Sequence, residues 1–97
     1  MVCTKYNVYR LKSNISQGLR DVTYEKYNRF GFDIKKDYYK LIECDDKLEI
    51  IDFHIHNFLE RLFTLSEGSI HMGDVIELYY DNKMERYFCN NIGWIKL

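Results

Sequence analysis

Apolar or aromatic residues alternate with polar ones in several short segments, and this pattern predicts β-strands. The first segment, YNVYRL, lies near the N-terminus, and three more follow one another closely near the C-terminus. A short polar connection, Asp81-Asn82-Lys83, separates two of these C-terminal segments and suits a hairpin. The predicted strands are residues 6–11, 38–44, 75–80, 84–89 and 92–97.

A short helix is predicted over residues 24–30, where Tyr24, Tyr27 and Phe30 recur at helical spacing. Thr23 can accept backbone N–H groups at its start, and Gly31 stands where a left-handed residue ends a helix. The polar segment 13–18 has no regular period and is expected to be a loop. Residues 33–36, with their short charge run, are expected to form a solvated turn.

A longer helix is predicted after the second strand. Asp46 and Glu49 have the spacing of a capping box, which indicates that this helix begins near Leu48. Its apolar face, at intervals of three and four residues, consists of Leu48, Ile51, Ile55, Leu59 and Leu62, widened by Phe58 and Phe63. Residues 66–69 (SEGS) are expected to end it.

The order of these elements is strand, helix, strand, helix and then a three-stranded meander. A chain of 97 residues falls in the range of one domain, so we expect a single domain over residues 1–97. The predicted fold class is α+β, with two helices packed on one face of a mixed or antiparallel sheet.

The charge balance excludes several classes of function. Lys and Arg total 14 against 15 Asp and Glu, a net charge of -1, so we expect no direct binding of nucleic acid or of an anionic membrane surface.

No apolar run approaches the roughly 18 residues that span a bilayer, and residues 1–10 lack the apolar core of a signal peptide. The expected location is cytoplasmic.

Neither a metal nor a cofactor is expected. Cys3, Cys44 and Cys89 are odd in number and widely spaced, which is typical of reduced thiols rather than of a disulfide framework. The chain has no CxxC and no HExxH motif. His54 and His56 would diverge by about 200° on the predicted helix, so they could not chelate one ion.

We also expect no catalytic site. A thiol paired with an imidazole could be imagined for Cys44 or Cys89, but no spacing demands it, and Cys89 lies in an aromatic strand where a buried thiol is usual. If the protein were an enzyme, a cysteine-dependent hydrolase would be the alternative to test. The five glycines are isolated and form no phosphate-binding loop.

Aromatic residues make up 16% of the chain, enough to fill a thin core or to supply a surface that meets a partner. Arg20 and Asp21 could form an internal ion pair or a recognition feature. Trp94 could be an interface residue or a core residue beneath the helices. The candidate protein-binding residues are Arg20, Asp21, Tyr79, Tyr80, Arg86 and Trp94, because Arg, Tyr and Trp dominate interface energetics.

Four separated motifs, in order, give the chain its resemblance to a family. They are YNVYRLK, LRDVTYEKYNRFG, YYKLIECDDKLE and the C-terminal SIHMGDVIELYYDNKMERYFCNNIGWIKL. In these motifs the chain resembles the YodL-like domain family, small α+β domains of Firmicutes found alone or within larger proteins on plasmids, phages and conjugative elements. It departs from the family at Ile92, where Phe is usual, and at Cys89-Asn90-Asn91, where an acidic residue and a serine are commoner.

The resemblance implies no catalytic residues. It implies a mobile-element protein that inhibits or modulates a host bacterial protein stoichiometrically, as an anti-restriction or anti-CRISPR factor does. The alternative is a regulator of cell shape that acts on the actin-like cytoskeleton, since one branch of the family resembles such regulators. The expected partner is accordingly a defence nuclease or a cytoskeletal protein.

Overall fold

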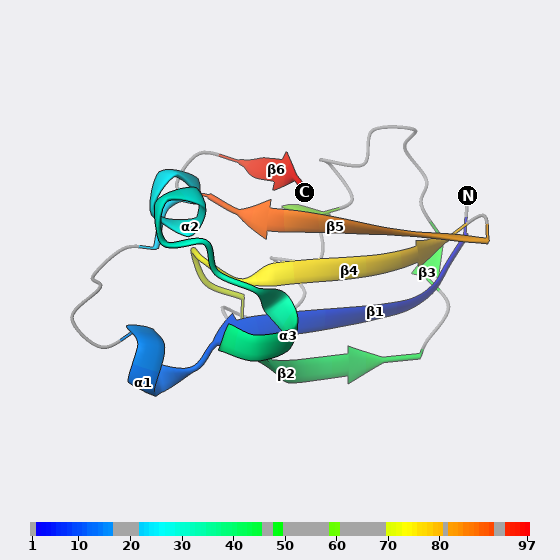
Figure 1. Cartoon of the computed structure of the whole chain (residues 1–97). Coiled ribbons are helices and arrows are strands. Elements are labelled where there is room, and N and C mark those ends of the chain that lie inside the picture. Colours follow the sequence, from blue (N-terminus) through cyan, green and yellow to red (C-terminus); the bar gives the residue numbers. More distant parts are fainter. Residues whose placement is uncertain are drawn as a thin grey trace.

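The computed structural model describes residues 2–16, 22–45, 48–49, 59–60, 70–80, 82–90 and 93–97. Six strands and three short helices lie in these ranges (Figure 1). The strands are β1 (Val2–Leu11), β2 (Tyr38–Cys44), β3 (Leu48–Glu49), β4 (Val75–Tyr80), β5 (Lys83–Cys89) and β6 (Trp94–Lys96). The helices are α1 (Ser13–Ser16), α2 (Tyr24–Phe30) and α3 (Ile34–Asp37).

All six strands belong to one antiparallel sheet with the order β2-β1-β4-β5-β6, and β3 pairs with the start of β1. The α+β class and the C-terminal meander are therefore confirmed. Strand β1 lies between β2 and β4. The N-terminal strand is thus paired directly with the first strand of the C-terminal meander. Its register shifts opposite β2 because Leu41 is an extra residue there, and opposite β4 because Thr4 is extra.

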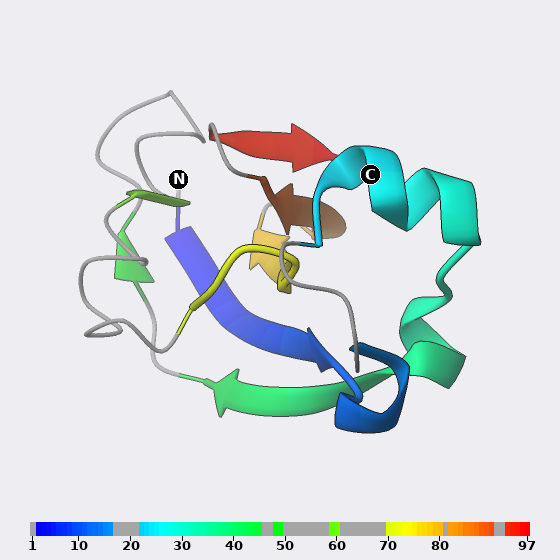
Figure 2. The same ribbon diagram turned by 90° about the vertical axis from the view of Figure 1, so that its left-hand side faces the viewer.

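Alternation along the strands sends apolar side chains to both faces of the sheet. The helix-side face carries the buried residues Leu11, Val22, Tyr38, Val75 and Phe88. The opposite face carries the buried residues Cys3, Val8, Leu59, Ile70, Ile76, Leu78, Tyr80, Tyr87, Cys89 and Trp94. Figure 2 shows α2 and α3 on the same side of the sheet.

Helix α2 has the bounds and both caps that the sequence predicts. The Thr23 side chain accepts a hydrogen bond from the Lys26 N–H at 3.3 Å, and Gly31 ends the helix with φ 63°. Tyr24 and Tyr27 pack on Phe88, with ring centroids 5.8 and 5.1 Å apart. This aromatic contact fixes α2 over the ends of β4 and β5.

Two segments expected to be irregular are instead short helices. Residues 13–16 form α1, and Ile15 packs against the helix-side core. Residues 34–37 form α3, whose N-cap Asp33 accepts a hydrogen bond from the Lys35 N–H at 2.8 Å. Single turns of this kind depend on one buried contact or one cap, and a search for helical period does not detect them.

The predicted start of the longer helix, near Leu48, is wrong. Leu48 and Glu49 form β3, whose backbone pairs with Cys3 and Val2, because β1 begins at Val2 rather than at Tyr6 and offers an edge for pairing. Leu59 and Glu60 are helical, as predicted, but Leu59 packs on the face opposite to α2. Ile51, Ile55, Leu62, His54, His56 and the Asp46 cap lie outside the described residues.

The β4–β5 hairpin is confirmed, but β5 begins at Lys83, which was predicted to lie in the connection. Tyr80 pairs with Lys83, which leaves a two-residue connection in which Asn82 adopts a positive φ of 59°. Within the described residues, strand β6 covers Trp94–Lys96, so Gly93 and Leu97, which the prediction included, fall outside it, and Ile92 lies outside the described residues. No helix in the described part of the chain is long and apolar enough to cross a membrane.

Candidate functional site

A buried carboxylate organises the half of the helix-side face that none of the described helices covers. Glu77 in β4 is only 3% exposed and lies between Asn7 of β1 and Arg86 of β5 in the strand register. Asn7 Nδ2 donates to Glu77 Oε1 at 3.1 Å, and Arg86 Nε donates to Glu77 Oε2 at 2.8 Å. The Tyr9 and Tyr79 hydroxyls donate to Oε1 at 3.1 and 3.4 Å. Four donors from three strands thus converge on one side chain.

These hydrogen bonds decide the charge of Glu77. Burial acts to raise the pKa of its carboxyl group, but the hydrogen bonds from Asn7, Arg86 and Tyr9 outweigh burial and hold the pKa below its usual value. Burial, together with the bond to Glu77, raises the pKa of Tyr9. At neutral pH Glu77 is therefore an ionised carboxylate and Tyr9 is a neutral phenol.

Asn7 contributes a second buried feature. The residue is 2% exposed, and its amide is oriented with Nδ2 toward the carboxylate. In the described structure its Oδ1 atom is buried and accepts no hydrogen bond. An unsatisfied buried acceptor reduces stability, so the polar cluster has not been optimised for stability alone.

Charged and apolar side chains surround the cluster. Lys5 Nζ lies 3.1 Å from Glu43 Oε1 and 5.8 Å from the centre of the Tyr79 ring. Lys40 Nζ lies 3.6 Å from Glu43 Oε2. Met84, opposite Tyr79 in the register, is 41% exposed. We call the following set the Glu77 surface: Lys5, Asn7, Tyr9, Lys40, Glu43, Glu77, Tyr79, Met84 and Arg86.

The helices leave this surface open. In Figure 1, α2 and α3 lie in front of the left part of the sheet, and neither reaches the right part, where β4 and β5 approach the hairpin turn. Among the described elements, none packs over Met84, and Arg86 keeps a side-chain exposure of 33%. In the part of the chain that the structure describes, the buried polar cluster is therefore bordered by partly exposed side chains.

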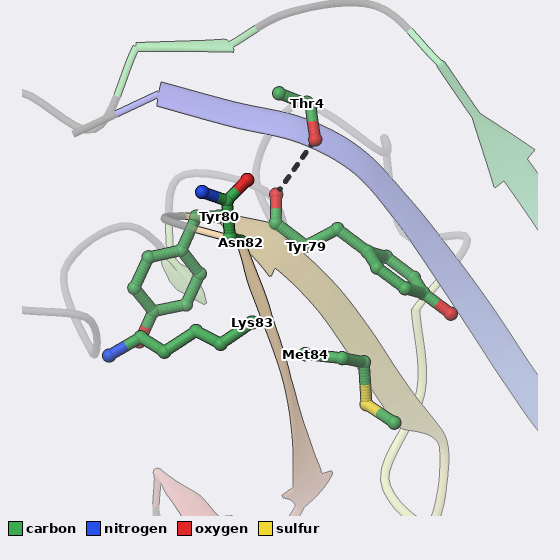
Figure 3. Close-up of a pocket in the computed structure, with 6 residues that line it drawn as sticks. All are labelled: Thr4, Tyr79, Tyr80, Asn82, Lys83 and Met84. Atoms are coloured by element: carbon green, nitrogen blue, oxygen red, sulfur yellow. Dashed lines mark hydrogen bonds between the residues drawn. The ribbon is translucent and has the colours of Figure 1, made fainter.

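A shallow pocket of about 400 Å³ adjoins the Glu77 surface at the hairpin end. Figure 3 shows Tyr79 and Met84 extending to one side of it and Tyr80 with Lys83 to the other. The Thr4 hydroxyl, from the extra residue of β1, donates to the Tyr79 carbonyl at 3.3 Å. The pocket therefore lies where the β1–β4 pairing is irregular.

On the opposite face, Glu85 links the hairpin to β6. The Tyr87 hydroxyl donates to Glu85 Oε2 at 2.6 Å, and Lys83 and Lys96 approach the carboxylate to 3.3 and 3.5 Å. The bond from Tyr87 is the main reason that the pKa of Glu85 is lowered to about 2. This second carboxylate links β5 to β6 through its ion pair with Lys96.

The Gly73-Asp74 turn that precedes β4 is also structural. Asp74 accepts from the His71 N–H at 2.7 Å and receives two bonds from Arg10, Nε to Oδ1 at 3.1 Å and Nη2 to Oδ2 at 2.9 Å. Gly73 has φ 94°, and a Cβ at that position would lie 2.9 Å from the Cβ atom of Val22. The turn therefore requires glycine, and its aspartate anchors β1.

The family assignment rests on the match of nearly the whole chain, residues 5–97, to the model of the YodL-like domain. The chain belongs to the YodL-like domain family. No curated protein and no solved structure matches it. Both the turn and the Glu77 surface lie within the matched residues of this YodL-like domain.

The candidate residues predicted from the sequence separate into three groups in this YodL-like domain. Tyr79 and Arg86 meet at Glu77 on the Glu77 surface. Tyr80 and Trp94 are each 6% exposed in the core of the opposite face, and Trp94 Nε1 donates to Glu60 Oε1 at 3.1 Å. Trp94 thus takes the core position that the sequence left open. Arg20 and Asp21 lie outside the described residues.

Sequence reasoning missed Asn7, Tyr9 and Glu77. Their signal was available, because residues 7 and 9 and residues 77 and 79 share a face of their strands by alternation. What the sequence could not supply was the register that places Asn7, Glu77 and Arg86 side by side. A polar residue on a strand otherwise rich in apolar residues was the one clue.

The thiols of the YodL-like domain are poorly placed for nucleophilic chemistry. Burial raises the pKa of Cys3 above its usual value and raises that of Cys89 to about 12, so both stay protonated at neutral pH. Cys44 is half-buried. In the described part of the chain, no group of three or more His, Cys, Asp or Glu side chains is arranged to hold a metal ion.

Proposed function

We propose that this protein is a non-catalytic inhibitor or modulator that binds a host bacterial protein stoichiometrically through the Glu77 surface. The observation that carries the proposal is the combination of Tyr79, Met84 and Arg86 on a part of the sheet that no described helix covers. Tyr, Met and Arg are enriched in protein interfaces, and Tyr and Arg supply much of the binding energy there.

The hydrogen bonds from Tyr79 and Arg86 to the buried Glu77 strengthen the proposal. Binding is weakened when side chains must be ordered at the moment of contact, by about 0.5–1.5 kcal/mol for each flexible one. Glu77 already fixes Arg86 through Nε and Tyr79 through its hydroxyl group. A partner would therefore meet side chains that are ordered before it arrives.

A non-catalytic role is supported by the state of the reactive groups. Glu77 is ionised but is bonded to four donors, and Cys3 and Cys89 are buried thiols with raised pKa values. Neither Glu77 nor these two thiols offers a free base or nucleophile in the described structure.

The family resemblance implies that the protein is encoded by a phage or other mobile element. This origin suggests which host proteins to test as partners. The first candidate is a restriction or CRISPR nuclease of the host, which the protein would inhibit as a counter-defence factor. The actin-like cytoskeleton that controls cell shape is the alternative partner.

Affinity capture from a bacterial lysate tests the proposal. The immobilised protein should retain a specific host protein, and the double variant Tyr79→Ala/Met84→Ala should lose it. The matched control is Glu25→Ala/Arg29→Ala, which removes an exposed ion pair of α2 and should retain the same protein. Retention that is equal for all three baits would contradict binding through the Glu77 surface.

A titration then separates stoichiometric binding from catalysis. The activity of the captured protein, nuclease cleavage or filament assembly, should fall in proportion to added protein and reach its minimum near a one-to-one ratio. Loss of activity at a small fraction of one equivalent would indicate turnover and would overturn the non-catalytic proposal.

A further inference from the structure

Arg86 uses only part of its hydrogen-bonding capacity within the molecule. Its Nε atom donates to Glu77 Oε2 at 2.8 Å, and no residue of the described structure accepts a hydrogen bond from either Nη group. A guanidinium group presents a planar fork of donors that matches a carboxylate, so an anchored Arg86 retains donors for an external acceptor.

The balance of charges on the Glu77 surface favours an anionic ligand. The Glu77 surface carries three cations, Lys5, Lys40 and Arg86, and two carboxylates, Glu43 and Glu77. The Glu77 side chain is only 4% exposed and is enclosed by its donors, whereas Glu43 is shared between the two lysines. An approaching group therefore meets an excess of positive charge.

Neutral phenols extend this environment. Burial raises the pKa values of Tyr9 and Tyr27, and the positive charge of Arg86 opposes the rise in both. The Tyr9 and Tyr79 hydroxyls donate to Glu77, so two phenol groups share the carboxylate that anchors Arg86.

Apolar side chains flank the same position. Met84 lies two residues from Arg86 on the same face of β5 and is 41% exposed. On the other side, the Leu97 N–H donates to the Arg86 carbonyl at 2.9 Å, and Leu97 is 39% exposed. A ligand that placed only a charge here would leave this apolar area in water.

We propose that the Glu77 surface recognises an acidic segment of its protein partner, in which an Asp or Glu carboxylate pairs with Arg86 and adjacent apolar side chains cover Met84. The inference rests on the proposed function and specifies the chemistry of the partner. A phosphate of a nucleic acid could also satisfy the guanidinium group, but the apolar flanks and the net charge of -1 favour a peptide carboxylate.

Selection from a library of random twelve-residue peptides displayed on phage tests this chemistry. The selected peptides should contain Asp or Glu next to apolar residues. Replacing that acidic residue by Asn or Gln should weaken binding by about tenfold or more, the usual effect of losing a hot-spot contact. Affinity should also fall as NaCl is raised from about 0.05 to 0.5 M.

Variants of Arg86 must not be confused with misfolded protein, because removing Arg86 alone leaves Glu77 without its cation. The double variant Glu77→Gln/Arg86→Gln removes both charges; Glu77→Gln preserves side-chain shape, and Arg86→Gln replaces the guanidinium group by a shorter, neutral amide. It should melt within about 5 °C of the wild type and lose peptide binding. Arg86→Lys keeps the charge but not the fork and should bind with intermediate affinity. Arg29→Ala, which removes an exposed arginine of α2, should bind normally.

Several outcomes would overturn the inference. These are selected peptides without acidic residues, a folded double glutamine variant that still binds them, failure to select any peptide, or binding of a fluorescent single-stranded oligonucleotide that depends on Arg86. If lysate capture depends on Tyr79 and Met84 while the captured segment lacks acidic residues, the proposed function stands and only the acidic recognition falls.

Discussion

Arg86 and Glu77 face each other on adjacent strands, with Arg86 Nε donating to Glu77 Oε2 at 2.8 Å, yet one of them is nearly buried and the other is one-third exposed. This asymmetry gives the pair two roles. The buried carboxylate organises side chains from three strands, and the exposed guanidinium group extends that organisation to the surface. Stability and recognition can therefore be tested on the same pair.

Replacing Glu77 by Ala should lower the free energy of unfolding by about 2–4 kcal/mol, because Asn7, Tyr9 and Arg86 lose their common acceptor in a largely buried site. Urea denaturation measures the change. The control Glu25→Ala removes a carboxylate that pairs with Arg29 in the open, and it should change stability by less than about 0.5 kcal/mol. Equal effects of the two substitutions would argue against a structural role for the buried cluster.

Glu85 should make stability depend on pH in the acid range. Its pKa is lowered from 4.5 to about 2 in the folded state, so between these values the unfolded state binds more protons than the folded state. Stability should therefore decrease as pH falls from about 4.5 toward 2. Urea titrations across this range should show a shallower decrease for Glu85→Gln, and a variant profile parallel to that of the wild type would refute the assignment.

Gly73→Ala should destabilise the protein by about 2–4 kcal/mol, because the new Cβ combines a left-handed backbone with a contact of 2.9 Å to Val22. Gly31 supplies the matched control: its φ is also positive, at 63°, but nothing lies within 4 Å of an added Cβ. Gly31→Ala should cost only about 1 kcal/mol. Thermal unfolding of both variants measures the difference, and similar losses would show that packing against Val22 does not matter.

The three cysteines should differ in reactivity. Cys3 is fully buried and Cys89 is 6% exposed, with a raised pKa for both thiols, whereas Cys44 is half-buried. A thiol reagent at about pH 8 should label Cys44 first in the native protein and all three residues in urea. Cys44→Ala should abolish the early labelling. Early labelling of Cys89 would contradict its place in the core.

Local signals in the sequence were sufficient for helix α2 and for the C-terminal meander. Thr23 and Gly31 mark both ends of α2, and the aromatic residues between them have one period. The hairpin was readable because its connection is short and its strands alternate. Where the signal was a single cap or one buried contact, as at Asp33 and Ile15, the same reasoning predicted irregular chain.

The candidate site was only partly accessible to such reasoning. Tyr79 and Arg86 were chosen because of their residue type, and the structure places them together at Glu77. Residue type gave the same prominence to Tyr80 and Trp94, which are buried on the other face. The face of a strand on which a residue lies depends on register and on what covers that face, and neither can be read from composition.

By itself, the sequence determined the α+β class, the capped helix α2 and the meander, because each depends on residues close together in the chain. The tertiary structure alone decided that Leu48 and Glu49 pair with the start of β1, and that Asn7, Glu77 and Arg86 form one cluster. Those contacts join residues as many as 70 positions apart. Their formation depends on the pairing of β1 with β4, a long-range register that no local pattern specifies.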